Sequence, residues 1–140
     1  MPHLVIRNSA SLESRANMSV LCRGLAETML AQMDEAGKPV FRPGGTRVLA
    51  YPATHFAVSD SGKAGLAAGG DGDYGLVYLN FRIGGGRSKA VHQSVGEARS
   101  AVANAHCAPL MKSIHMGLTL EIDVGTEVFD AKRSTLHAGD

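Results

Sequence analysis

The chain has 140 residues, of which 44% are hydrophobic and 19% charged, and its formal net charge is +1 at pH 7. Such values are typical of one globular domain that buries a core without disulfides or metal, and they exclude the disordered and fibrous classes. No run of Lys and Arg is longer than a pair, which argues against a nucleic-acid or membrane-surface binder. We expect one domain over 1–140 with a small-molecule partner, and neither nucleic acid nor membrane.

The first half of the chain, about 2–51, predicts a β-α-β unit. The run PHLVI at 2–6 is short and β-branched and is followed by turn-forming residues, which indicates a strand. A helix over about 12–36 is predicted by apolar side chains at helical spacing: Met18, Leu21, Cys22, Leu25, Met29 and Met33. After a Pro-Gly-Gly turn, the apolar segment Thr46 to Tyr51 predicts a second strand.

A loop is predicted over about 52–73, between the two halves. Residues 59–73 (SDSGKAGLAAGGDGD) are mostly Gly, Ala, Ser and Asp and have no apolar period. A loop of this length in a small domain is either a cover for an active site or a disordered insertion. The sequence leaves these two alternatives open.

The second half, about 74–122, predicts another β-α-β unit, followed by a polar tail over about 123–140. Residues from Tyr74 to Ile83 alternate with period two, which is typical of a strand covered on one face. Ser88 is placed to cap a helix that ends before Pro109. The predicted apolar stripe of this helix is Val91, Val95, Ala98, Val102 and Ala105. Gly117 to Ile122 predicts the last strand.

Two tandem β-α-β units predict an α+β fold. Right-handed crossovers place four strands in one sheet with both helices on one face, so the other face is left bare. An apolar sheet face of that size exceeds what soluble monomers normally expose. We therefore expect a homo-oligomer.

The sequence predicts neither a metal site nor a cofactor. Its six histidines have no i, i+4 pairing and no cysteine partners. The Gly-Gly-Gly-Arg-Ser segment at 84–88 has the spacing of neither a P-loop nor a dinucleotide fingerprint. Cys22 and Cys107 are expected to be buried free thiols. The N-terminus is unlike a secretory signal, and no window is apolar enough for a membrane span, so we expect a cytoplasmic protein.

Pro2 is a candidate catalytic residue. A proline at the second position permits removal of the initiator methionine, which would expose a secondary amine. At the start of a strand in an apolar pocket, desolvation and nearby arginines would lower the pKa of this amine. An amine poised near neutral pH can both accept and return a proton. Position alone does not separate this hypothesis from that of an incidental second residue.

Four segments together resemble the tautomerase superfamily, and within it the 5-carboxymethyl-2-hydroxymuconate delta-isomerases. They are PHLVI at the start, GGTR before the second strand, DYGLVYLNFRIGGGRS across the third, and LTLEI near the end. The resemblance implies that Pro2 is the catalytic proline and that Arg47 and Arg87 bind substrate carboxylates. It also implies the tautomerase fold and a homotrimer that needs no cofactor.

The leading hypothesis is therefore an isomerase that converts a 2-hydroxydienoate with at least two carboxylates, such as 5-carboxymethyl-2-hydroxymuconate, to its 2-oxo-3-enoate in aromatic-acid catabolism. The planar forks of two arginines suit this task, because each can hold one carboxylate at two points. Two alternatives remain. One is a tautomerase for another enol or keto acid, and the other is a non-catalytic trimeric binding protein with the same fold.

Overall fold

The protein is described by a computed structural model that covers residues 3–125, 129, 131 and 133–136. Its four strands are β1 (His3–Ser9), β2 (Arg47–Ala53), β3 (Gly75–Gly84) and β4 (Met116–Gly125). Its helices are a 3-10 turn, η1 (Ala10–Leu12), and the α-helices α1 (Met18–Ala31), α2 (Lys63–Ala67) and α3 (Lys89–Met111). The two predicted β-α-β units are thus present.

The strands form one sheet in the order β2-β1-β3-β4. β1 runs parallel to β2 and β3 runs parallel to β4, whereas β1 and β3 are antiparallel neighbours in the centre. This is the arrangement that two right-handed β-α-β units give when their first strands pair. The starts of β1 and β2 therefore lie at the same end of the sheet as the ends of β3 and β4.

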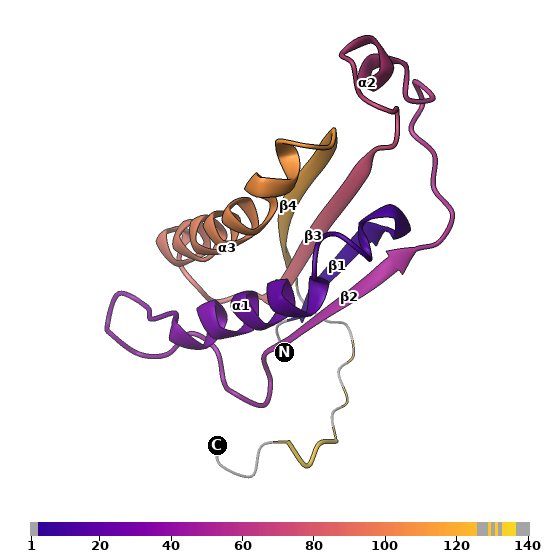
Figure 1. Ribbon diagram of the computed structural model, residues 1–140. Helices are drawn as coiled ribbons and strands as arrows, with labels where there is room; N and C mark the ends of the chain where they lie inside the picture. Colours follow the sequence, from indigo (N-terminus) through magenta and orange to yellow (C-terminus); the bar gives the residue numbers. More distant parts are fainter. Residues whose placement is uncertain (1–2, 126–128, 130, 132, 137–140) are drawn as a thin grey trace.

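Both long helices cover the same face of the sheet (Figure 1). The core between them is built from alternate residues of the two central strands, among them Leu4 and Ile6 of β1 and Leu79 and Phe81 of β3. From α1 the core receives Met18, Leu21, Leu25 and Met29. The period-two and helical patterns thus identified most of the core correctly.

The first long helix is shorter than the predicted 12–36. Its cap, Asn17, has a left-handed backbone (φ 43°) and its side chain accepts a hydrogen bond from the Val20 N–H, so α1 cannot extend back toward residue 12. At the other end, Gln32 is extended and its carbonyl accepts the N–H of Val40 at 2.9 Å. The backbone conformations and hydrogen bonds of Asn17 and Gln32 therefore set the two ends of α1.

The second long helix continues through Pro109 to Met111 instead of ending before the proline. A proline in the last turn removes one intrahelical hydrogen bond and leaves the rest of a 23-residue helix intact. The buried stripe also differs from the prediction, because Ala105 is exposed. The buried residues of α3 are Val91, Val95, Arg99, Ala103 and Cys107. No helix in the described part of the chain is long and apolar enough to cross a membrane.

The loop predicted over 52–73 contains a short helix, α2, and is held by hydrogen bonds. The Tyr74 hydroxyl donates to Asp60 at 2.7 Å and accepts the Gly65 N–H at 3.0 Å. The hydrogen bond to the Asp60 carboxylate raises the pKa of Tyr74, and the same contact lowers the pKa of Asp60. The segment lies beyond the end of the sheet at which β3 begins (Figure 1).

Among the described residues, no helix or strand covers the sheet face away from α1 and α3, as predicted, but this face is not apolar throughout. Its β2 side exposes Leu49 and Tyr51. In the half of the same face that β3 and β4 form, Tyr78 donates to Glu121 at 2.6 Å and Asn80 donates to Asp123 at 2.9 Å. Polar residues at alternate positions of β3 and β4 pair directly across the strands, which makes half of this face hydrophilic.

Candidate active site

Three arginines lie at the end of the sheet where β1 begins. The strand register places the first residue of β1, His3, between Arg47 of β2 and Arg82 of β3. β3 then ends at Gly84, and Arg87 follows in the turn before α3. Pro2, the predicted catalytic residue, lies outside the described residues. The fold therefore brings the two predicted substrate-binding arginines to the same end of the sheet, beside the strand that Pro2 precedes in the sequence.

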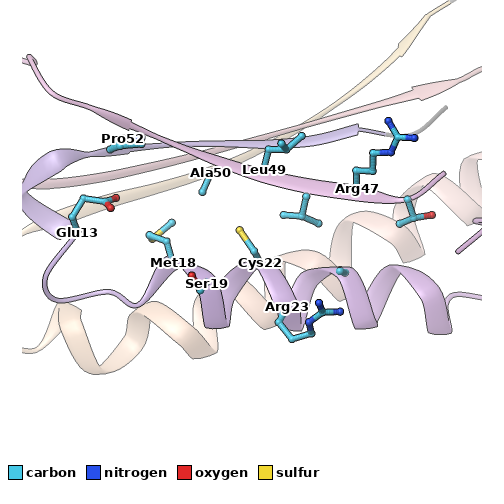
Figure 2. A pocket seen from close by; sticks show the side chains of 12 residues that line it. Glu13, Met18, Ser19, Cys22, Arg23, Arg47, Leu49, Ala50 and Pro52 are labelled. Carbon is cyan, nitrogen blue, oxygen red and sulfur yellow. The ribbon is translucent and has the colours of Figure 1, made fainter. Parts of the chain in front are cut away.

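Arg47 is half-buried at the first position of β2. Its Nε donates to the Gly44 carbonyl at 3.4 Å. Figure 2 shows its side chain, like that of Leu49, on the side of β2 away from α1, whereas Ala50 points toward the helix. Among the residues that the structure describes, the two terminal nitrogens of Arg47 have no hydrogen-bond partner, and such a pair of nitrogens suits a carboxylate.

Arg87 is more firmly held than Arg47. Its Nη1 donates to the Gly84 carbonyl and its Nη2 to the Val40 carbonyl, each at 3.3 Å. Its guanidinium carbon also lies 5.5 Å from the centre of the Phe41 ring, within the range of a cation–π contact. The turn that carries Arg87 is thereby fixed to the segment that leads from α1 toward β2.

The N-terminus of α3, which follows Arg87, is capped by Ser88. The Ser88 hydroxyl accepts the Val91 N–H at 3.2 Å and donates a hydrogen bond to the Glu35 carboxylate. A helix N-terminus attracts anions, and here a carboxylate of the same chain lies at the cap. The arginines, and not this helix end, are therefore the better candidates for holding a substrate carboxylate.

An open groove of about 740 Å³ runs between α1 and the edge strand β2 (Figure 2). Arg47 and Glu13 lie toward its opposite ends, and Cys22 points from α1 toward β2 between them. Burial raises the pKa of the Cys22 thiol, so this cysteine is a poor nucleophile at neutral pH. Both cysteines are free thiols, although Cys22 is only half-buried.

The segment predicted as a loop lies far from the two arginines of its own chain. It leaves β2 at Ala53, at the opposite end of the seven-residue strand from Arg47, which is about 20 Å along an extended chain. It does not cover Arg47 within one subunit. Groups of three or more His, Cys, Asp or Glu side chains suited to a metal ion are absent from the described residues.

One charged residue near this end was not predicted from the sequence. Arg99 of α3 is completely buried, and burial lowers its pKa to about 10. The signal was its position, because it follows two buried valines at intervals of four, Val91 and Val95. A charged residue in a stripe of that spacing is buried in the core. Because arginine is rarely buried completely, such a residue is a candidate for a functional role.

The model of the 5-carboxymethyl-2-hydroxymuconate isomerase family matches residues 2–139. The chain is 25% identical to the 5-carboxymethyl-2-hydroxymuconate Delta-isomerase of Escherichia coli, over 99% of this chain and 98% of that protein. A crystal structure of a 5-carboxymethyl-2-hydroxymuconate delta-isomerase is 54% identical, with a TM-score of 0.94 over 99% of this chain and 91% of the other. The corresponding isomerase from Deinococcus radiodurans R1 is 27% identical, with a TM-score of 0.77 over 98% and 92%.

More distant solved structures share only the fold. The symmetric trimer of a fused 4-OT is 17% identical and has a TM-score of 0.54, and the asymmetric trimer is 13% identical with a TM-score of 0.56. Each covers 99% of this chain and is itself covered over 99%. The four-stranded sheet with helices on one face is therefore the tautomerase fold, as the sequence predicted.

Proposed function

Because this chain belongs to the 5-carboxymethyl-2-hydroxymuconate isomerase family, and is an isomerase of that type, we propose that it converts 5-carboxymethyl-2-hydroxymuconate to its 2-oxo-3-enoate isomer. The observation that carries this choice is the position of Arg47 and Arg87 at the end of the sheet where β1 begins. A substrate with several carboxylates needs cationic groups on more than one side of the base. Breakdown of an aromatic acid in the cytoplasm is the proposed setting.

Pro2 is the proposed base. After removal of Met1, its free secondary amine accepts the proton of the substrate's 2-hydroxyl group. The electrons of the O–H bond form the C2 carbonyl, the double bonds shift along the diene, and the ammonium returns its proton to the distant diene carbon. No atom is gained or lost in this sequence, and the amine is restored. Arginines at the end of the sheet where β1 begins would favour the neutral amine, since like charges lower the pKa of an ammonium.

Arg47 and Arg87 are the proposed carboxylate-binding residues. The terminal nitrogens of Arg47 form a planar fork, which suits two-point binding of a carboxylate. Arg87 has two donors committed to backbone carbonyls, which orients its guanidinium before the substrate arrives. Both cations also stabilise the negative charge that develops on the dienolate in the transition state.

We also propose a homotrimer. The exposed apolar side chains Leu49 and Tyr51 on this sheet face are suited to a subunit contact, and the outer edge of β2 has no partner strand among the described residues. Structures with this fold include the fused 4-OT trimers. Sedimentation equilibrium tests the assembly, for which a trimer mass is expected at micromolar concentration. A stable monomer would contradict it.

The substrate is tested with purified protein and ultraviolet absorbance of the dienol. We expect a higher kcat/KM for 5-carboxymethyl-2-hydroxymuconate than for 2-hydroxymuconate, which lacks the carboxymethyl arm, or for the enol of phenylpyruvate. Mass spectrometry of the same sample should show a chain that begins at Pro2. Equal or faster turnover of the two smaller compounds would contradict the proposed substrate. Retained Met1 would rule out the Pro2 amine as the base.

A further inference from the structure

Arg99 is a fully buried cation without a carboxylate partner among the described residues. Its Nη1 donates to the Val95 carbonyl at 2.8 Å and to the Gln32 side-chain oxygen at 3.4 Å. Its Nε and Nη2 have no hydrogen-bond partner in the part of the chain that the structure describes. A pKa of about 10 leaves the side chain charged at neutral pH. An unpaired buried charge opposes folding, and a hydrophobic side chain of similar volume would pack the same space. Fold stability alone therefore gives no reason for an arginine here.

The guanidinium of Arg99 is placed against two aromatic rings. Its central carbon lies 5.3 Å from the centre of the Phe41 ring and 5.2 Å from that of Phe81. The two rings meet edge to face, with centroids 5.6 Å apart and an interplanar angle of 85°. Cation–π attraction at these distances is strongest where water is excluded, as it is at this site. Arg99 thus fixes the ring of Phe41, which belongs to the loop between α1 and β2.

Phe41 is also the ring that contacts Arg87, whose guanidinium carbon lies 5.5 Å from its centre. The buried arginine and the proposed substrate-binding arginine therefore share one aromatic neighbour. A second connection runs through the backbone. Arg99 donates to the side chain of Gln32, the Gln32 carbonyl accepts the Val40 N–H at 2.9 Å, and the Val40 carbonyl accepts Nη2 of Arg87 at 3.3 Å.

We propose that Arg99 is a positioning residue for substrate binding, which acts through Phe41 and Val40 to hold the guanidinium of Arg87 in the orientation that a carboxylate requires. The inference rests on the proposed function, because it gives Arg87 a carboxylate as its partner. Two-point binding of a carboxylate depends on the plane of the guanidinium, and a displacement of about 1 Å can cost a hundredfold in rate. Arg99 itself touches no substrate.

The test is a double-mutant cycle on the purified, full-length enzyme with 5-carboxymethyl-2-hydroxymuconate. Arg99→Met removes the charge and keeps an unbranched apolar side chain. Because Arg87 loses its fixed support, KM should rise about tenfold, with a smaller change in kcat. In the Arg87→Ala background the same substitution should change KM less than twofold. An equal change of KM in both backgrounds would overturn the proposal, as would an unchanged KM in the single variant.

Two further variants separate positioning from general loss of structure. Phe41→Leu removes the ring and keeps most of the apolar volume, so it should raise KM as Arg99→Met does, even if the latter does not fold. Cys107→Ala truncates another buried residue of α3, outside this network, and should leave KM unchanged. A rise in KM with Cys107→Ala, or an unchanged KM with Phe41→Leu, would contradict a role through Arg87. If Arg87→Ala itself leaves KM unchanged, the proposed function of Arg87 fails, and not merely the role of Arg99.

Discussion

Replacement of each substrate-binding arginine by alanine should separate their contributions to folding and to binding. In Arg87 the substitution removes two hydrogen bonds of 3.3 Å to backbone carbonyls and one cation–π contact at 5.5 Å. At the lower end of the usual values, because the bonds are long and the side chain is half-exposed, these contacts contribute about 1.5 to 2 kcal/mol. In Arg47 only one bond of 3.4 Å is lost, which contributes about 0.5 kcal/mol or less.

Both variants should lose binding to a similar extent. A charge-assisted contact with a carboxylate is worth about 1.5 to 3 kcal/mol, so kcat/KM should fall roughly tenfold to a hundredfold in each. Against a substrate without the carboxymethyl group, one of the two substitutions should become nearly silent. Urea denaturation at one fixed protein concentration measures the stability difference, and steady-state kinetics measures the binding.

The exposed Arg15→Ala variant is the matched control, since it removes the same charge away from this end of the sheet. It should change neither stability nor kcat/KM by a measurable amount. The reasoning is refuted if Arg47→Ala destabilises the protein as much as Arg87→Ala. It is also refuted if both variants retain wild-type kcat/KM on mono- and dicarboxylates, because the arginines would then be ordinary turn residues.

Two stability predictions concern other parts of the fold. The Tyr74 hydroxyl and the Gly62 N–H hold the pKa of Asp60 below its ordinary value near 4, so its contribution is present above about pH 4 and is lost as pH falls through the folded pKa. In urea titrations, wild type should therefore be more stable than Asp60→Asn at pH 7, with a gap that closes in acid, and a constant gap would contradict this linkage. Gly75→Ala should cost about 1 to 3 kcal/mol, because a Cβ there would lie 2.7 Å from Cδ2 of buried Leu12, whereas Gly85→Ala meets nothing within 4 Å and should be neutral. Equal stability of these two glycine variants would be the contrary result.

The sheet and the core could be predicted from the sequence because their signal is periodic. Alternation in β3 and helical spacing in α1 each follow from burial of one face, and this is a property of consecutive residues. The helix boundaries could not be predicted in the same way. The left-handed cap at Asn17 and the bond from Val40 to Gln32 depend on how loops pack on the finished fold.

The candidate site was predictable as a set of residue types, but not as a set of contacts. The turn that contains Arg87 and the strand that begins with Arg47 were recognised by their resemblance to a family. Arg87 donates to the Val40 carbonyl, 47 positions away in the sequence. This contact depends on how the two β-α-β units pack together. Arg99 was overlooked because an arginine in a helix is usually exposed, and its burial depends on two phenylalanines from other elements.

The central claim is that the amine of Pro2 transfers the proton. Pro2→Ala tests it most directly, provided that mass spectrometry shows an exposed N-terminus in both proteins. With 5-carboxymethyl-2-hydroxymuconate, kcat should fall by about a hundredfold or more while KM changes little, because the secondary amine and its ring geometry are lost and the arginines still bind the carboxylates. A kcat within a fewfold of wild type would contradict proton transfer by Pro2.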